Sequence, residues 1–435
     1  MLSTQPYKGA RDFYPQDMQI RNYIFETWKK VCKLYGYEEY DFPILEPFEI
    51  FAAKTGEEIV NQQLFSFEDK SGRKLAMRPE ITPGTVRMLA ARYKALVKPI
   101  RWFMIGNNWR YEQPQKGRGR EFYQLEVNIF GSANIAADFE IFSIIIDLMK
   151  AFGANETMFS LSVSDRRLVT GLLEDALSLT DAQILGTRRL MDRRSKMSKD
   201  AFESTLQVIG LDKAQIQKVE QFMSSSFENL SQVILPSILT ANEGYQNLLN
   251  LFELLKQVDL AKFCKFDPSI IRGFDYSDGL VYEVFDKNPK NTRSLFGGER
   301  FDKLIQIFGD YDLPATGFAM GDVTLNEFLL GWSLIPNLRQ QPDFLVALWP
   351  KNSSDYIKTA NYVATKLRDT GKSVVVWVDP NTKLEKQLKY ANRKEIPQVV
   401  IIGKTELENN TVTIKDMQTG SQETKPLDKF LNDIS

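Results

Sequence analysis

Apolar and polar positions in the first 160 residues follow two repeats, one typical of helices and one typical of strands. Residues 17–35 have the 3.6-residue repeat of an amphipathic helix, with apolar side chains at Ile20, Ile24, Trp28 and Val31. Residues 121–130 alternate strictly, with Tyr123, Leu125, Val127 and Ile129 on one face and Gln124, Glu126 and Asn128 on the other. Residues 100–112 form a second predicted strand, and the short loop at 113–119 predicts antiparallel pairing.

The pattern changes twice along the chain, and each change predicts a domain boundary. Residues 165–263 are helical in their periodicity, so we expect a helical insertion within a domain spanning residues 1–335. From residue 341 the chain predicts strands alternating with helices, which indicates a compact α/β domain over 341–435 with a mostly parallel sheet. In this domain Asn409 and Asn410 are expected to turn a final hairpin.

Composition limits the class of protein and its chemistry. The 435 residues are 43% apolar and 26% charged, as in soluble globular proteins, and no apolar run is long enough to span a bilayer. The N-terminus lacks the apolar core of a secretory signal, and Cys32 and Cys264 form no CxxC pair, so we expect a cytoplasmic protein without a cysteine zinc site. The absence of histidine excludes histidine general bases, serine–histidine triads and histidine-ligated metals.

A polar stripe on the predicted hairpin is the first candidate site. Arg110 and Glu112 share one face of their strand, and the polar face of residues 121–130 lies across the hairpin. The stripe is either a surface ladder of ion pairs or the floor of a polar pocket. In a pocket, the planar fork of Arg110 would suit a phosphate or a carboxylate.

Two groups of basic residues each have two interpretations. The hairpin loop carries Lys116, Arg118 and Arg120, and one predicted helix carries Lys386, Lys389 and Arg393. Because the net charge is only −1, any nucleic-acid contact must come from local patches such as these. The loop is either a solvated turn or a flap over a polyanion such as ATP, and the helix face is either solvated or a footprint for a phosphate backbone.

Together these segments resemble the class II aminoacyl-tRNA synthetases, and specifically the histidyl-tRNA synthetase family, over nearly the whole chain. Residues 9–15 (Gly-Ala-Arg-Asp-Phe-Tyr-Pro) look like the family's N-terminal signature, residues 35–46 like motif 1 at a dimer interface, and residues 109–124 like motif 2. Residues 272–276 (Arg-Gly-Phe-Asp-Tyr) resemble a peptide found in the histidine enzymes and not in other class II synthetases. This peptide argues against the synthetases for proline, threonine or glycine.

The resemblance implies a fold and an activity. The fold is an α+β catalytic domain (an antiparallel sheet flanked by helices) with a helical insertion, plus a C-terminal α/β anticodon-binding domain. The activity is ATP-dependent activation of L-histidine and its transfer to tRNA(His), with Mg²⁺ bound through ATP and a homodimer as the working form. The alternative is a non-catalytic regulatory paralogue that senses histidine or tRNA. Such paralogues lack the anticodon domain and do not keep the sequence of the 272–276 peptide. This chain has both the domain and the peptide.

The resemblance also implies roles for individual residues. For ATP, Arg110 is expected to hold the α-phosphate. Glu112, Arg118 and Arg120 are expected to contact ATP and the acceptor end of the tRNA. For histidine, Arg272 is expected to bridge the substrate carboxylate and the α-phosphate. The expected histidine pocket comprises Glu80 on the α-ammonium, Thr82, Gln124 and Asn128, with Tyr276 and Ser277 closing on the imidazole. The expected tRNA contacts are Lys116, Arg118, Lys386, Lys389 and Arg393.

Three positions depart from the family pattern. Thr324 stands where motif 3 usually has an arginine near the triphosphate tail, and we expect Arg300 or Arg293 to replace it. Asn128 is more often acidic in the family and Ser277 is more often tyrosine, so both change how the imidazole is held.

Overall fold

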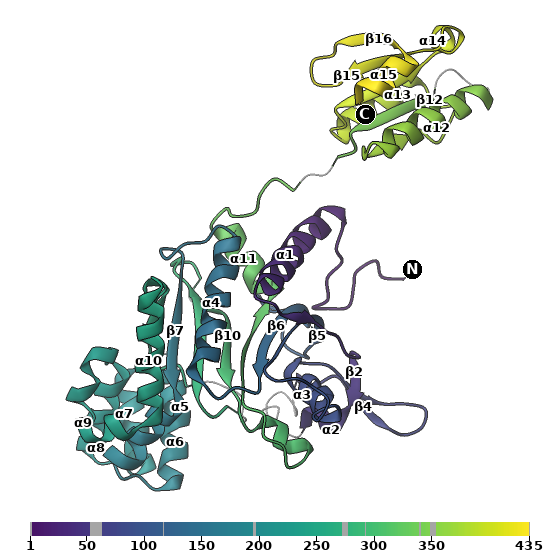
Figure 1. Ribbon diagram of the computed structural model, residues 1–435. Helices are drawn as coiled ribbons and strands as arrows, with labels where there is room; N and C mark the ends of the chain where they lie inside the picture. Colours follow the sequence, from purple (N-terminus) through teal and green to yellow (C-terminus); the bar gives the residue numbers. More distant parts are fainter. Residues whose placement is uncertain are drawn as a thin grey trace. The chain divides into compact units, whose positions relative to one another are not determined.

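The computed structural model describes residues 2–52, 63–115, 117–194, 197–271, 277–291, 293–338, 341–348 and 354–434 (Figure 1). The chain forms two compact units, Met1–Asn337 and Leu338–Ser435. Each unit has hydrophobic cores of its own. In the described part of the chain, no helix combines the length and the apolar character needed to cross a membrane.

The larger unit is built on an eight-stranded sheet with the order β1-β5-β6-β11-β10-β9-β7-β8. The outermost pairs, β1 with β5 and β7 with β8, are parallel, and the pairs between them are antiparallel. The strands are β1 Glu38–Glu39, β5 Ile100–Trp109, β6 Glu121–Phe130, β7 Phe159–Asp165, β8 Cys264–Phe266, β9 Leu280–Asp286, β10 Ser294–Arg300 and β11 Ala315–Gly321.

Strict alternation along β6 divides this sheet into a covered face and a polar face. Leu125, Val127 and Ile129 are fully buried in the main core. That core also contains residues of the helices α1 (Pro15–Leu34), α4 (Ile135–Ala151) and α11 (Asp322–Gly331). The alternating residues of β6 point to the opposite face, as the sequence predicts. The predicted antiparallel hairpin is also confirmed, although β5 ends at Trp109 and not at residue 112.

A three-stranded sheet with the order β2-β4-β3 supports the segment that leads to the polar face. Its strands are β2 Leu45–Pro47, β3 Ser66–Glu68 and β4 Lys74–Met77, and α2 (Phe48–Ala52) lies between β2 and β3 in the chain. Residues 78–81 follow β4, and α3 (Thr82–Ala91) begins directly after them with proline in its first turn. This order brings Glu80 and Thr82 from a strand end to a helix start.

Helices fill the chain between β7 and β8. They are α5 Arg166–Gly171, α6 Asp181–Asp192, α7 Lys199–Ile209, α8 Lys213–Met223, α9 Pro236–Ala241 and α10 Glu243–Gln257. Their buried residues, such as Phe202, Phe222 and Leu251, belong to the same core cluster as the sheet. α10 packs against α4, so the helical segment adjoins the covered face of the sheet (Figure 1).

The smaller unit has a five-stranded sheet with the order β13-β12-β14-β15-β16. β12 pairs in parallel with β13 and β14, whereas β15 and β16 add antiparallel strands. The elements are β12 Phe344–Leu348, α12 Ser354–Asp369, β13 Val374–Val376, α13 Leu384–Arg393, β14 Gln398–Ile402, α14 Lys404–Glu408, β15 Thr411–Asp416, β16 Gln422–Pro426 and α15 Leu427–Ile434.

The hairpin predicted at Asn409 and Asn410 is wrong. These residues end the short helix α14, where Asn410 takes the left-handed conformation with a φ of 52°. The hairpin turn lies further on, between β15 and β16, and Gly420 has the positive φ there (76°). Asparagine suits both a hairpin turn and a helix end, because its side chain tolerates the left-handed region.

Candidate functional site

Polar residues form two rows across the central strands on the polar face of the sheet. Directly opposed residues of antiparallel strands point to the same side. The register therefore gives one row of Asn128, Gly317 and Glu299, and a second row of Glu126, Ala319, Gly297 and Glu283. Glycine and alanine occupy the middle of both rows, so the central strands offer only small side chains between the polar residues of β6 and the carboxylates of β9 and β10.

Glu126 is the most confined charged group of these rows, with 2% of its surface exposed. Its Oε1 accepts hydrogen bonds from Thr82 Oγ1 at 2.9 Å and from Asn128 Nδ2 at 3.0 Å. Burial raises the pKa of Glu126 to about 7; the Glu80 carboxylate adds to the rise, and the hydrogen bonds and Arg78 oppose it. Because Glu80 acts on the pKa of Glu126, the 78–82 segment lies close to this face of the sheet.

A hydrogen-bonded chain fixes the amide of Gln124. Arg78 is buried, and its Nε donates to Asn108 Oδ1 at 3.1 Å. Asn108 Nδ2 in turn donates to Gln124 Oε1 at 2.7 Å. Because Gln124 Oε1 accepts this bond, the orientation of the amide is determined.

Arg110 lies just beyond the end of β5, beside the 78–82 segment. Its Nε donates to the backbone oxygen of Pro79 at 2.9 Å, and its guanidinium carbon lies 5.3 Å from the centre of the Phe122 ring. These two contacts orient the guanidinium without neutralising it. The structure thus brings Arg110 next to the segment that carries Glu80 and Thr82.

The loop after Arg110 closes tightly and is anchored at both ends. Gln115 and Arg118 exchange backbone hydrogen bonds of 3.0 and 2.9 Å, and Arg118 Nη1 lies 3.6 Å from Glu112 Oε2. Arg120 is buried, and its guanidinium contacts the Tyr7 hydroxyl and the backbone oxygen of Glu112. Arg120 therefore fastens the loop to the N-terminal segment, and Lys116 is outside the described residues.

Thr324 has a structural contact at the start of α11. Its Oγ1 donates to the backbone oxygen of Leu295 at 2.6 Å. The prediction that Arg300 replaces a motif 3 arginine is wrong, because its side chain is 3% exposed and pairs with Asp138 and Asp302 inside the fold. Arg293 is exposed, and its Nη2 lies 3.2 Å from Gln115 Oε1, beside the loop after Arg110.

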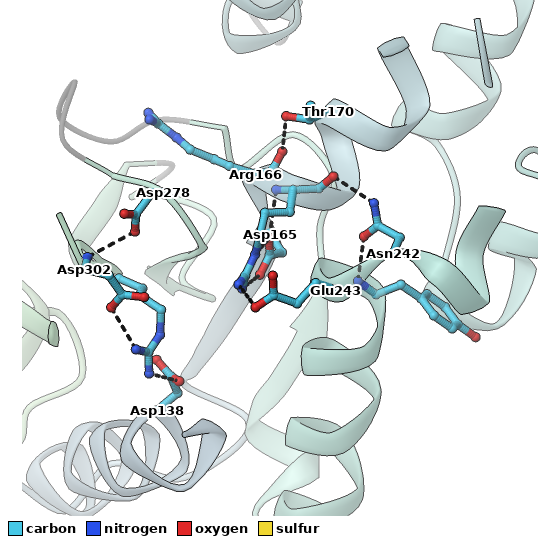
Figure 2. A network of polar contacts seen from close by, with 11 residues as sticks. Asp138, Asp165, Arg166, Thr170, Asn242, Glu243, Asp278 and Asp302 are labelled. Atoms are coloured by element: carbon cyan, nitrogen blue, oxygen red, sulfur yellow. Dashed lines mark hydrogen bonds and ion pairs between the residues drawn. The ribbon is translucent and has the colours of Figure 1, made fainter. Parts of the chain in front are cut away.

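Arg272 and Tyr276 lie outside the described residues, but the residues that flank residues 272–276 are held firmly. Ser277 is buried, and Arg166 donates to the backbone oxygens of both Ser277 and Ile271. Asp278 accepts a bond from the backbone nitrogen of Asp302 at 3.1 Å. Figure 2 draws the bond between Asp278 and Asp302, and it also shows Asp165, Arg166, Asn242 and Glu243, which come from β7, α5 and the start of α10.

The basic residues predicted on the C-terminal domain lie on one helix, α13. Lys386, Lys389 and Arg393 are exposed, and Lys389 pairs with Glu385 at 2.6 Å. On the other side of α13, Ala391 is buried in a core cluster against which Leu384 and Leu388 pack.

Sequence reasoning placed Glu126 on the polar stripe with Gln124 and Asn128 but gave it no role of its own, and it did not single out Asn108 or Arg166. The strict alternation of the strand was enough to place Glu126 on their face. Asn108 and Arg166 gave no such signal, since their contacts join segments that are 16 to 111 residues apart.

Comparison with known proteins identifies the family. A family model described as histidyl-tRNA synthetase matches residues 9–324, which is more than half of the chain. The chain belongs to the histidyl-tRNA synthetase family. A second model, described as an anticodon binding domain, matches residues 344–435. Histidine--tRNA ligase from Leptospira biflexa is 40% identical over 434 residues, covering 100% of this chain and 98% of that protein.

Solved structures agree with the histidyl-tRNA synthetase fold. Histidyl-tRNA synthetase from Nostoc sp. PCC 7120 has a TM-score of 0.81 and 21% identity, covering 100% of this chain and 99% of that one. A protein from Bacillus halodurans C described as an ATP phosphoribosyltransferase regulatory subunit/histidyl-tRNA synthetase has a TM-score of 0.77 and 21% identity, covering 93% and 99%. Since both kinds of description occur on this fold, the fold alone does not separate enzyme from regulator.

Proposed function

We propose that this chain is a histidine--tRNA ligase, which activates L-histidine with ATP and transfers it to the 3′ end of tRNA(His) in the cytoplasm. The observation that carries the proposal is the 40% identity to a histidine--tRNA ligase along the whole length of both chains. The match of residues 344–435 to an anticodon binding domain argues further against the regulatory alternative.

The histidine site in this proposal lies on the polar face of β6. Glu80 binds the α-ammonium together with Thr82 and the fixed amide of Gln124. Asn128 and Ser277 lie along the ring, and by the family resemblance Arg272 and Tyr276 complete the site. A buried carboxylate such as Glu80 pairs well with an ammonium group, because each charge compensates the desolvation of the other.

Activation needs alignment and charge neutralisation, with no general base. The carboxylate of histidine attacks the α-phosphorus of ATP and pyrophosphate leaves, so the new bond is an acyl–phosphate bond and no proton moves. Arg110, oriented by Pro79, neutralises charge on the α-phosphate, and Arg272 bridges that phosphate and the attacking carboxylate. Glu112 and Arg118 contact ATP and the acceptor end of the tRNA, and Arg120 positions the loop that carries them. Arg293 binds the triphosphate tail of ATP.

Mg²⁺ is expected with ATP, where it would offset charge on the phosphates. Glu283 and Glu299 lie on the polar face of adjacent strands, and their carboxylate oxygens are the hard ligands that Mg²⁺ prefers. For tRNA, we propose Lys116 and Arg118 at the acceptor end and Lys386, Lys389 and Arg393 on the anticodon-binding domain. We also propose a homodimer, with residues 35–46 at its interface.

The test is ATP–pyrophosphate exchange by the purified full-length chain with each of the twenty amino acids. Exchange that depends on histidine alone is expected. Exchange with a different amino acid would keep the mechanism and overturn the substrate. No exchange from a folded chain would overturn the enzymatic function.

A further inference from the structure

We propose that Glu126 is the carboxylate through which this chain recognises the imidazole ring of histidine. The inference rests on the proposed function and adds a specificity-determining residue to it. The resemblance gives pocket roles to Gln124 and Asn128, on either side of Glu126, and none to Glu126 itself.

The position of Glu126 places it between the residues that the proposal assigns to histidine. It alternates with Gln124 and Asn128 along β6, so all three side chains leave the sheet on one face. Hydrogen bonds join it to Thr82 on one side and to Asn128 on the other. A ligand that spans Gln124 and Asn128 therefore passes directly over Glu126.

Among the described residues, the contacts of Glu126 leave its Oε2 atom for a ligand. In the described part of the chain, the hydrogen bonds that Glu126 accepts both reach Oε1. A neutral glutamine could accept the same two bonds through its single oxygen, so these contacts do not require a charge. The chain nevertheless carries a carboxylate here, although burial opposes its charged form strongly enough to raise the pKa to about 7. Buried ionisable groups whose charged form is unfavourable for folding are typical of binding sites.

The imidazole ring is the part of histidine that suits this carboxylate. Its ring nitrogens have a reference pKa of about 6.5, close to that of Glu126, so the two groups form a hydrogen bond whether or not they share a proton. The Glu80 carboxylate also acts on the pKa of Glu126, and the proposed function commits Glu80 to the α-ammonium.

Asn128 is held in an orientation that supports this role. Its Nδ2 atom donates to Glu126, so its Oδ1 atom is oriented to accept a hydrogen bond. That oxygen lies over Gly317, where a Cβ atom would approach it to 1.8 Å. Glycine at this position is therefore what allows the amide to sit beside the carboxylate. Asn128 is neutral, and the charge that recognises the ring comes from Glu126.

The test is histidine-dependent ATP–pyrophosphate exchange by the full-length Glu126→Gln variant. We expect the KM for histidine to rise about ten- to hundredfold, as for loss of a hydrogen bond to a charged group, with the KM for ATP unchanged. The unfolding temperature should not fall, because glutamine removes a buried charge. The matched control is Glu140→Gln on α4, which removes a carboxylate paired with Arg101 and should leave the KM for histidine unchanged.

An unchanged KM for histidine in Glu126→Gln overturns this inference and leaves the proposed function standing. The proposed function fails separately, if the wild-type chain shows no exchange with histidine. If Glu126→Gln does not unfold cooperatively, the double variant Glu126→Asn with Asn128→Glu decides the matter, since it returns one carboxylate to the same face. Histidine-dependent exchange by the double variant, together with a raised KM for histidine in Glu126→Asn alone, supports the inference. Wild-type KM in Glu126→Asn alone, or a folded double variant without exchange, overturns it.

Discussion

The Nη1 atom of Arg166 donates a 2.9 Å hydrogen bond to the backbone oxygen of Ser277. The Nη2 atom of the same guanidinium lies 3.4 Å from the backbone oxygen of Ile271. One side chain, at the start of α5, thus holds the residues on both sides of residues 272–276. If Arg272 bridges the two reacting groups as proposed, Arg166 is a positioning residue that acts through the backbone.

We predict that Arg166→Met lowers kcat for histidine-dependent exchange by about tenfold to a hundredfold, because a small displacement of an aligned group is costly. Binding of ATP relies on other residues, so its KM should change little. Stopped-flow or steady-state exchange measures the split between kcat and KM. Arg189→Met, at an exposed site on α6, is the control. A full kcat in Arg166→Met would show that the flanking residues are held without it.

We predict that Arg300→Met destabilises the larger unit by about 3–5 kcal/mol, because it leaves the buried carboxylate of Asp138 without its partner. Burial already raises the pKa of Asp138, and Arg300 opposes that rise. Denaturant unfolding measures the free-energy change. Asp138→Asn together with Arg300→Met should recover part of it, and a strictly additive double variant would argue against the pairing.

We predict that the stability advantage of Glu126→Gln over the wild type grows as the pH rises from about 5 to about 8. Burial holds the folded-state pKa of Glu126 at about 7, above the ordinary glutamate value of 4.5. The folded state therefore binds more protons between these values, and wild-type stability falls through this window as the pH rises. The difference should approach an upper limit of about 3 kcal/mol above pH 7 and vanish below pH 4.5.

Thermal unfolding of both proteins across this pH range measures the difference in their stability. The groups near Glu126, namely Glu80, Arg78 and Tyr40, are present in both proteins, so their own titrations largely cancel. A difference that does not depend on pH would mean that Glu126 does not titrate in this window.

We predict that replacing Lys386, Lys389 and Arg393 by glutamine weakens binding of tRNA(His) and leaves exchange without tRNA unchanged. Each phosphate contact that is lost should reduce the slope of log affinity against log salt by about 0.7–0.9. Lys389 pairs with Glu385, so it should contribute less than Lys386 or Arg393. Filter binding at several salt concentrations gives the slopes, and an unchanged slope would place the tRNA contact elsewhere.

The parts of the fold that depend on local periodicity were predictable from the sequence. The short loop at 113–119 predicted the antiparallel pairing of β5 with β6. The alternation along β6 predicted the side on which Leu125 and Asn128 lie, because a strand has only two faces. The first helix was predicted to within two residues at its start, where Pro15 occupies the first helical turn.

Contacts between distant segments were not predictable in the same way. Arg300 looked available for a phosphate, but it meets Asp138, which is 162 residues away in the chain. Arg120 stood in a basic loop and is held by Tyr7, 113 residues away. Nothing in a local pattern distinguishes an arginine with a buried partner from one that faces a ligand, since both have the same sequence neighbours.

The burial of Glu126 in a chain without histidine has a spectroscopic consequence. Any imidazole resonance in the complex would belong to the bound substrate, because the polypeptide contributes none. A histidine labelled with ¹⁵N in the ring would report its own tautomer and protonation state against an empty background. The polypeptide therefore gives no background signal of its own, and a hydrogen bond between the substrate ring and the Glu126 carboxylate can be tested directly, without isotopic editing of the protein.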